Sequence, residues 1–457
     1  MKNICFIANF SKTQVFHAIA QQFSPTEYRV FWICTNQKIR VELLENYPAE
    51  RVLFLPTTIP TQSPVTDLKI NELLYGDRVL RYDLPAGKRY LESIQQPIYQ
   101  FIQQNKIRLV FGELTWSHEI LIHRLCRSCR ELNCQMLNPH VVRIPNQRFA
   151  FFVDERQSKL LLLNQTYAWN GEALKATPPS YLKINDQRLK KAASISGRLH
   201  RVKRFLTNEN MDKTDPALLN HLGYRLRTRC AEEWRKETYR WVKKTPFKEV
   251  QEQPYVYLGL HKQPEASVDT FGRYYEDQLQ NIKNLWRALP TGWNLLIKEH
   301  TNAIGDRSRR FYQEIQKLPN VYLVEETTNS YQMIRSAKLV ATVTGTMAYE
   351  AALMDVPAVT FAPVFFNRLN GCRQIQLADL NQYNLAEIAE QLSQEQPNIL
   401  RFSAYLWNNS CGGTLTDPIS NPKVLDAANI KLLSDGFRLA ISRIFLAKAT
   451  KNMLVAV

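Results

Sequence analysis

The sequence lacks the features of two large classes, disulfide-stabilised proteins and helical membrane proteins. Its 457 residues contain eight cysteines, which in a chain of this length do not form a disulfide framework. No apolar run approaches the roughly 18 residues that a transmembrane helix needs. The N-terminal stretch MKNICFIANFSK is a short strand pattern interrupted by Asn9 and Lys12, so we expect no signal peptide. A cytoplasmic protein with reduced thiols is the expectation.

The chain also has fewer acidic than basic residues. The chain has 42 Asp and Glu against 59 Lys and Arg, a net charge of +17 and a pI near 9.4. Such a charge predicts an anionic partner: nucleic acid, anionic lipid, nucleotide sugars and acidic polysaccharide all fit. No recognisable DNA- or RNA-binding motif is present, so we expect no specific nucleic acid. Cys126, Cys129 and Cys134 have no second pair of ligands at zinc spacing, so we expect no metal.

Strand and helix patterns alternate in two series, which predicts an α/β fold with mainly parallel sheets. The first series has strands at 2–8, 28–34, 51–55 and 107–113 and helices at 13–23, 88–105 and 116–133. The second has strands at 255–260, 294–300, 321–326, 339–343 and 357–362 and helices at 274–289, 306–318 and 330–337. We therefore predict domains at 1–182 and 251–400, a basic helical insertion at 183–250 between them, and a C-terminal tail and helix at 401–457.

The stretch LVATVTGTMAYEAALMDVPAVTFAP, residues 339–363, joins a buried strand to a helix through Thr344, Gly345 and Thr346. Gly345 lets the backbone approach a ligand, and Thr344 or Thr346 can cap the helix. The free N–H groups and dipole of a helix N-terminus attract a phosphate. Glu350 lies one turn further along, where it can accept hydrogen bonds from sugar hydroxyls. The alternative is an ordinary capped helix with an exposed glutamate.

Two more strands of the second series end in polar side chains. Strand 255–260 leads into a loop with Gln263, Glu265 and Asp269, and strand 294–300 ends in Lys298 and His300. Ligands of parallel sheets collect at the carboxyl ends of strands. We therefore predict that these ends converge on the same phosphate as the turn at Gly345.

The motifs QPEAS, KEH, TGT followed by Glu350, and FGE followed by RIPNQRFAFF resemble those of bacterial capsule-polysaccharide glycosyltransferases. The likeness is to the Kdo transferases of capsule synthesis, and it covers about 110–156 and 255–372. It implies a GT-B-like fold, with two Rossmann-like domains facing a cleft, a CMP-activated sugar donor, and neither a metal nor another cofactor. Thr301 stands where the family usually has proline after the histidine, so the loop geometry there departs from the pattern.

The resemblance also implies roles for the residues already named. Thr344, Gly345 and Thr346 would receive the donor phosphate, Lys298 and His300 would offset its charge, Glu350 would bind the ribose, and Gln263 and Glu265 would shape the nucleotide pocket. It leaves the sugar, the linkage and the stereochemical outcome open.

The chemistry of sugar transfer asks for a base on the acceptor side. Glu113 follows strand 107–113 directly and is the candidate base, while Asp154, with Asp269 behind it, is the candidate nucleophile if configuration is retained. The acceptor is expected to be an anionic glycan or a lipid-linked chain. The helix pattern from 429 to 457 either crosses back onto the N-terminal domain or rests on an anionic membrane. Two other functions stay open: a CDP-glycerol-type phosphotransferase and a non-catalytic nucleic-acid-binding protein.

Overall fold

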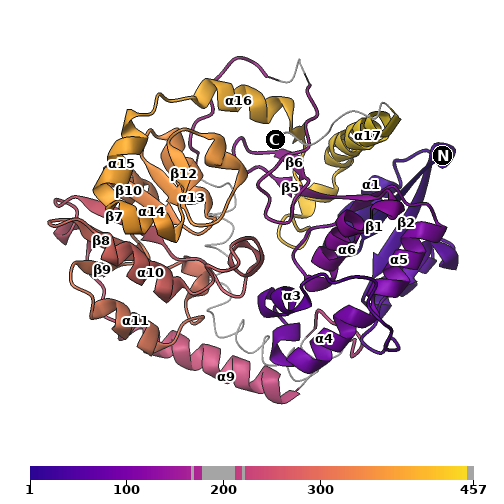
Figure 1. Ribbon diagram of the computed structural model, residues 1–457, viewed down its shortest axis with the longest axis horizontal. Coiled ribbons are helices and arrows are strands. Elements are labelled where there is room, and N and C mark those ends of the chain that lie inside the picture. Colours follow the sequence, from indigo (N-terminus) through magenta and orange to yellow (C-terminus); the bar gives the residue numbers. More distant parts are fainter. Residues whose placement is uncertain (166–168, 178–211, 219–221, 450–457) are drawn as a thin grey trace.

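A computed structural model describes residues 1–165, 169–177, 212–218 and 222–449. Two α/β domains lie side by side, each built on one sheet (Figure 1). The N-terminal sheet has the strand order β13-β6-β5-β4-β1-β2-β3, parallel from β5 to β3 and antiparallel at β6 and β13. Its strands are β1 (Lys2–Ile7), β2 (Tyr28–Cys34), β3 (Val52–Phe54), β4 (Leu109–Phe111), β5 (Gln135–Val141), β6 (Arg148–Phe152) and β13 (Cys411–Gly412).

Helices cover both faces of this sheet, which explains why β1, β2 and β4 contain apolar runs. In β1, Ile4 and Phe6 point into one core and Cys5 and Ile7 into the other. The first core is closed by α1 (Lys12–Ala20) and by a C-terminal helix described below. The second is closed by α3 (Ile70–Gly76), α4 (Leu84–Ser93), α5 (Gln95–Gln104) and α6 (Ser117–Ser128), and α2 (Gln37–Leu44) follows β2.

The C-terminal sheet is parallel throughout, in the order β12-β11-β10-β7-β8-β9. Its strands are β7 (Tyr255–Gly259), β8 (Asn294–Lys298), β9 (Val321–Val324), β10 (Leu339–Thr342), β11 (Ala358–Thr360) and β12 (Cys372–Gln374). Side chains of β7 alternate between two cores, as in the first sheet. The covering helices are α10 (Gln278–Arg287), α11 (Arg309–Gln316), α12 (Ser330–Ser336), α13 (Thr346–Leu353), α14 (Leu377–Gln382), α15 (Leu385–Gln394) and α16 (Ile399–Asn408).

One basic helix, α9 (Leu222–Tyr239), belongs to the predicted insertion at 183–250. Residues 183–211 and 219–221 of that insertion lie outside the described residues. The helix runs along the C-terminal domain, where Arg235 Nη1 donates to the Asp306 carbonyl at 3.0 Å and the Tyr239 ring lies 5.1 Å from that of Tyr312. The insertion therefore continues directly into the second domain.

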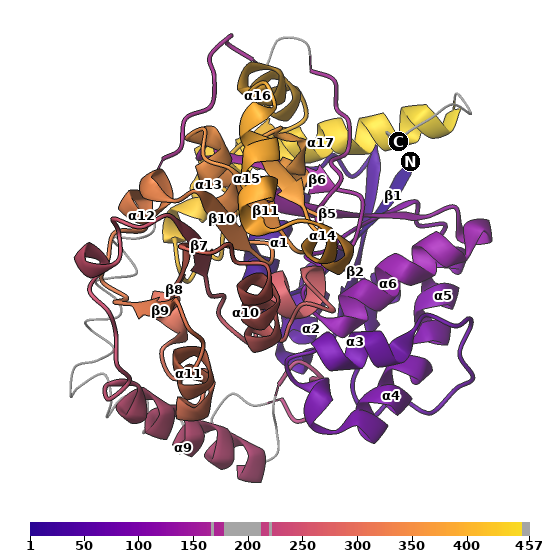
Figure 2. The same ribbon diagram turned by 60° about the vertical axis from the view of Figure 1, so that its left-hand side comes forward.

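The long helix α17 (Ala427–Ala449) crosses back to the N-terminal domain. Figures 1 and 2 both show it, in yellow, beside the N-terminal sheet. Phe437 is fully buried, with its ring 4.7 Å from that of Phe111 and 5.0 Å from that of Phe151. Of the helices within the described ranges, none combines the length and apolar character needed to cross a bilayer.

The predicted fold class is confirmed: the chain forms two Rossmann-like domains with a basic helical segment between them. Several boundaries were wrong. The helix predicted at 88–105 is two helices that meet at Ile94, and the helix predicted at 274–289 begins only at Gln278. Residues 267–271 form a π-helical turn instead, and the sequence analysis did not predict β5, β12 or β13.

Candidate active site

The predicted phosphate turn joins β10 to α13 at the carboxyl edge of the C-terminal sheet. Gly345 is the N-cap of α13, and no side chain caps the helix. The expectation that Thr344 or Thr346 caps it is therefore wrong, because Thr344 Oγ1 donates to the Ser267 carbonyl at 2.7 Å and Thr346 is exposed. A helix whose first N–H groups lack a side-chain cap keeps them for water or a ligand.

A buried histidine holds this turn in place. His261, directly after β7, accepts the Val343 N–H at 3.3 Å through Nε2, and the same nitrogen lies 2.7 Å from Thr342 Oγ1. The Nε2 atom therefore carries no proton, and the Thr342 hydroxyl donates to it. Thr342 Oγ1 in turn accepts the Gly345 N–H at 3.1 Å. Burial, with the nearby His300 and Arg307, lowers the pKa of His261 to about 3, so the ring stays neutral.

Lys298 and His300 end β8, next to β7 in the sheet. Lys298 Nζ donates to the Thr328 carbonyl at 2.5 Å and to Ser330 Oγ at 2.8 Å, and burial lowers its pKa to about 8. His300 is exposed and accepts the Asn302 N–H through Nδ1 at 3.2 Å. Partial loss of hydration lowers the pKa of His300, against the opposing charge of Glu265. Lys298 and His300 thus stand at the same sheet edge as the turn, Lys298 at the end of β8 and His300 two residues after it.

Between them, Glu299 faces inward and has a structural role. Its carboxylate is buried and accepts hydrogen bonds from Arg307 Nη1 and the Tyr312 hydroxyl, both at 2.6 Å. Burial nevertheless raises the pKa of Glu299, since desolvation outweighs these partners. Directly after β8 the chain thus turns Glu299 into the core and leaves His300 exposed.

Glu350, the predicted ribose ligand, is engaged by the N-terminal domain. Arg143 Nη2 lies 2.5 Å from Glu350 Oε1, and both side chains are about nine-tenths buried, with 9% and 8% of their surface exposed. The neighbouring Tyr349 hydroxyl donates to the Ile144 carbonyl at 2.9 Å. Burial raises the pKa of Glu350, and the charge of Arg143 opposes this.

Arg143 has spare hydrogen-bonding capacity. Within the described part of the chain, its Nε and Nη1 atoms are buried and have no hydrogen-bond partner. Because a buried guanidinium N–H without an acceptor is costly, a ligand oxygen beside Glu350 would also find donors on Arg143. The sequence analysis missed this residue, since nothing in the spacing of RIPNQRFAFF links Arg143 to Glu350.

The loop after β7 is braced by two of its own polar residues. Gln263 Nε2 donates to Asp269 Oδ1 at 3.0 Å, and the Glu265 N–H donates to Asp269 Oδ2 at 2.9 Å. Asp269 is buried, whereas the Glu265 side chain is exposed and accepts from Ser267 Oγ at 2.9 Å. The structure thus uses Gln263 and Asp269 to shape the loop and leaves Glu265 accessible to a ligand.

Glu113 lies at the carboxyl end of β4 in the other domain. Its carboxylate forms an ion pair with Lys12 and accepts from Asn9 Nδ2 at 2.8 Å. The buried Glu119 lies behind it and accepts the Thr115 N–H at 2.7 Å, and burial raises the pKa of Glu119. Lys12 was missed as a partner, although it follows strand β1 just as Glu113 follows β4.

Asp154 is part of a tight loop. Its carboxylate accepts the N–H groups of Ser158 and Lys159 at 3.0 and 2.8 Å and the Ser158 hydroxyl at 2.8 Å. Among the described residues, no hydrogen bond or ion pair joins Asp154 to Glu113 or to the turn at Gly345. Its role as a nucleophile stays a prediction, and its observed role is to shape the loop.

The cysteines are all free, and within the described ranges no group of three His, Cys, Asp or Glu side chains is arranged to hold a metal. The carboxyl edges of the two sheets carry different chemical groups. One edge offers an uncapped helix N-terminus with Lys298 and His300 beside it, and the other offers a carboxylate paired with lysine. The first suits a phosphate, and the second suits proton transfer.

Comparison with models of known protein families and with curated protein sequences found no match. Solved structures of similar architecture include two KpsC structures from Thermosulfurimonas dismutans. One is a beta Kdo 2,7 transferase, at 11% identity over 94% of this chain and 100% of that chain with a TM-score of 0.36. The other is a beta Kdo 2,4 transferase, at 13% identity over 73% and 87% with a TM-score of 0.34. A UDP-GlcNAc 2-epimerase from Methanocaldococcus jannaschii is similar at 12% identity over 95% and 100%, with a TM-score of 0.30. At these values the similarity describes the arrangement of the chain and carries no information on donor or acceptor.

Proposed function

We propose that the protein is a glycosyltransferase that moves an acidic sugar, Kdo or a related sugar, from a CMP-activated donor to an anionic glycan or a lipid-linked acceptor. The observation that carries the proposal lies at the ends of three adjacent strands, β10, β7 and β8. There an uncapped helix N-terminus at Gly345, the neutral His261 that positions it, and the side chains of Lys298 and His300 lie at one sheet edge.

In this proposal the C-terminal domain binds the donor. A departing phosphate gains negative charge, and fixed N–H groups and positive side chains stabilise that charge without a metal. The α13 N-terminus and Lys298 would supply these groups, with His300 as a hydrogen-bonding side chain beside them, and Arg143 would add two donors beside Glu350 that have no partner among the described residues. The sugar part of the nucleotide would exchange hydrogen bonds with Glu350, which already has Arg143 as counter-ion.

The N-terminal domain would bind the acceptor and remove its proton. Glu113 is the proposed base, and Lys12 forms an ion pair with its carboxylate. If transfer retains configuration, Asp154 is the proposed nucleophile, and it would have to give up hydrogen bonds from its own loop to act. The proposed setting is the cytoplasmic side of a membrane that carries the acceptor.

A thermal-shift panel tests the donor side, because a ligand that binds the folded state raises the melting temperature. The panel contains CMP, CDP, UDP, UMP, GDP and CDP-glycerol, with and without magnesium. We expect CMP alone to stabilise the wild type and to lose that effect in Thr346→Ala and His300→Ala, but not in Thr291→Ala, an exposed threonine of the same domain. Selective stabilisation by UDP or CDP-glycerol would mean that the donor carries that nucleotide and not CMP. No response to any of these ligands would favour a non-catalytic protein.

Glu113→Gln tests the acceptor side. We expect transfer from CMP-Kdo to be abolished while the CMP-induced shift remains, because Glu113 lies in the other domain from the donor turn. Glu50→Gln, an exposed acid in the same domain, serves as the control and should keep full activity. Wild-type turnover in Glu113→Gln would remove Glu113 from the mechanism.

A further inference from the structure

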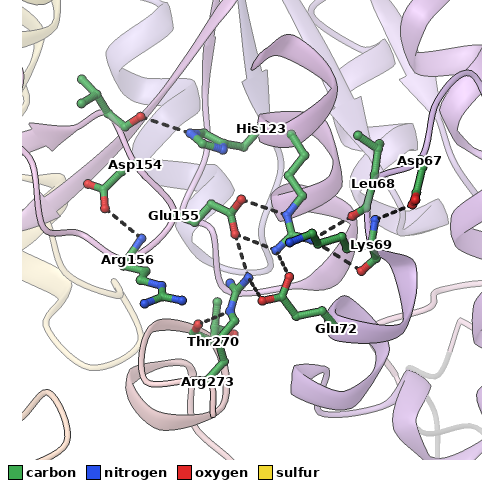
Figure 3. Close-up of polar contacts among 12 residues, drawn as sticks. Asp67, Leu68, Lys69, Glu72, His123, Asp154, Glu155, Arg156, Thr270 and Arg273 are labelled. Atoms are coloured by element: carbon green, nitrogen blue, oxygen red, sulfur yellow. Dashed lines mark hydrogen bonds and ion pairs between the residues drawn. The ribbon is translucent and has the colours of Figure 1, made fainter. Parts of the chain in front are cut away.

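A cavity of about 410 Å³ lies where the two domains meet, apart from the turn at Gly345. Figure 3 shows its polar side chains, which come from α3, from α6 and from the loop after β6. One lining residue, Arg273, belongs to the C-terminal domain. The cavity is therefore formed mainly by the N-terminal domain, the one that holds Glu113.

The inner wall of this cavity is an ion-pair network without net charge. Arg124 Nε donates to Glu155 Oε1 at 2.8 Å, and Arg124 Nη2 donates to Glu72 Oε2 at 2.6 Å. Arg273 Nη1 donates to Glu155 Oε2 at 2.8 Å and lies 3.3 Å from Glu72 Oε1 (Figure 3). Two arginines and two glutamates thus neutralise one another, and none of the four is left over for a ligand.

Three further cations line the cavity. Within the described part of the chain, no hydrogen bond or ion pair is formed by the charged groups of Lys69, Arg127 or Arg156, all three of which line the cavity. In Figure 3 no dashed line joins the guanidinium of Arg156 to the other residues drawn. The lining aspartates Asp67 and Asp154 offset two of these three charges and leave the cavity with a net charge of +1. Neither aspartate pairs with the three cations among the described residues, because Asp154 accepts hydrogen bonds from its own loop and Asp67 accepts the backbone N–H of Lys69 at 3.0 Å.

Such an arrangement suits a planar anion. A guanidinium presents five N–H donors in a fixed fork, which matches the two oxygens of a carboxylate. Two free guanidinium groups and one ammonium at the rim of a cavity of sugar size therefore fit an acidic sugar. A neutral sugar would leave these donors to water.

The cavity is separated from the phosphate turn by a single loop. Thr344, in the turn, donates to the carbonyl of Ser267, and a Cβ atom at Gly272 would lie only 2.5 Å from Val343 Cγ1. The next residue, Arg273, lines the cavity. Residues 267–273 therefore have the turn on one side and the cavity on the other, which places the cavity within reach of a chain that is being extended at the turn.

We infer that this cavity binds an acidic sugar of the acceptor chain through its carboxylate, held by Arg127 and Arg156 with Lys69 beside them. The inference rests on the proposed function, because it takes sugar transfer as the reaction and assigns the acceptor subsite. It makes the enzyme selective for acceptors that already carry a negative charge.

Equilibrium binding of free Kdo, N-acetylneuraminic acid, glucose and inorganic phosphate, followed by ligand-observed NMR, tests the inference. The variant is Arg127→Gln with Arg156→Gln. The control is Arg309→Gln with Arg310→Gln, which removes two exposed arginines from α11. We expect the acidic sugars, but not glucose, to bind the wild type and the control, and to bind the variant at least tenfold more weakly. Equal binding in variant and wild type, or no acidic sugar bound by the wild type, would overturn the inference. The inference would also be overturned if phosphate bound in a way that needs Arg127 and Arg156 while neither acidic sugar bound, because the cavity would then be a phosphate site.

The CMP thermal shift separates this inference from the proposed function. If CMP still shifts the melting temperature but acidic sugars bind equally well without Arg127 and Arg156, the cavity assignment is overturned. The proposed donor site is then unaffected. Pair-dependent sugar binding without any CMP shift would support the cavity assignment and count against the CMP-dependent transferase. The Arg127→Gln, Arg156→Gln variant itself should keep the wild-type CMP shift.

Discussion

Gly345 is a residue of the candidate donor site at which the backbone lies close to its neighbours. A Cβ atom there would lie 2.6 Å from Thr342 Oγ1 and 3.2 Å from His261 Cε1. Both atoms belong to the hydrogen-bonded network that holds the turn, so neither can move without breaking it. Glycine is thus required here because Thr342 and His261 lie so close to the position of an added Cβ atom. Its backbone conformation does not require glycine, since any residue can adopt a φ of −68°.

We predict that Gly345→Ala destabilises the protein by about 1 to 3 kcal/mol, the usual cost of an overpacked site. The same change should abolish stabilisation by CMP, because the first N–H groups of α13 shift. Urea unfolding and the thermal shift measure the two effects.

Gly371→Ala is the matched control. A Cβ atom at Gly371 would meet Ala352 at an ordinary 3.7 Å, so this variant should lose little stability and keep the CMP response. Similar losses in both variants would show that the turn at Gly345 has no special role.

At the scale of single residues, the rule that ligands meet strand ends predicted part of the site. It placed Gly345, Lys298 and His300 at one sheet edge, because each directly follows a buried apolar run. It could not predict that Arg143 pairs with Glu350, since 207 positions separate them and only the packing of the domains brings them together. The inward orientation of Glu299 follows from strand alternation, which the sequence did contain.

Helix α17 shows how one element can complete a domain that lies far away in the sequence. Phe437 fills the N-terminal core among Phe6, Phe111, Phe149 and Phe151. The preceding residue is Gly436, where a Cβ atom would lie 2.7 Å from Phe149 Cζ. The small residue lets the helix approach the sheet, and the large one fills the space between them.

We predict that Phe437→Ala lowers the free energy of unfolding by about 3 to 5 kcal/mol, the range for removing a buried phenylalanine. Leu432→Ala, on the same helix but 51% exposed, should change it by less than about 0.5 kcal/mol. Chemical denaturation of both variants checks this. Equal effects would mean that the helix does not dock as described.

Short or irregular elements were the ones that the sequence did not reveal. Strand β5 contains Asn138 and Pro139, which interrupt the apolar run that marks its neighbours, and yet it pairs on both sides. Strand β13 is two residues long and exists only because it pairs with Phe149 and Arg148 of β6. Patterns within one segment cannot disclose a strand that is defined by a distant partner.

For the whole molecule, the network of Arg124, Glu72, Glu155 and Arg273 joins the two domains. Burial alone would raise the pKa of Glu155, but its hydrogen bonds and its proximity to Arg124 and Arg273 lower it to about 2. A carboxylate with a depressed pKa in the folded state stabilises that state above its unfolded pKa, and this contribution is lost as the pH falls toward the folded pKa.

We therefore predict that Glu155→Gln costs about 3 kcal/mol at pH 7, since one pKa unit corresponds to about 1.4 kcal/mol. The difference from wild type should shrink as the pH falls below about 4.5 toward 2. Urea unfolding between pH 7 and pH 3 measures it. A difference that stays constant over this range would show that the charge of Glu155 does not stabilise the network.

The return of α17 and β13 to the first sheet sets an order of events during synthesis. The N-terminal strands leave the ribosome first, but one of their two faces is covered only in part, by α1, until residues near 437 have been made. At about 5 to 20 residues per second, that interval lasts on the order of tens of seconds. During it the nascent chain carries an exposed aromatic face, so we expect it to depend on chaperones more than a protein whose domains close one after the other.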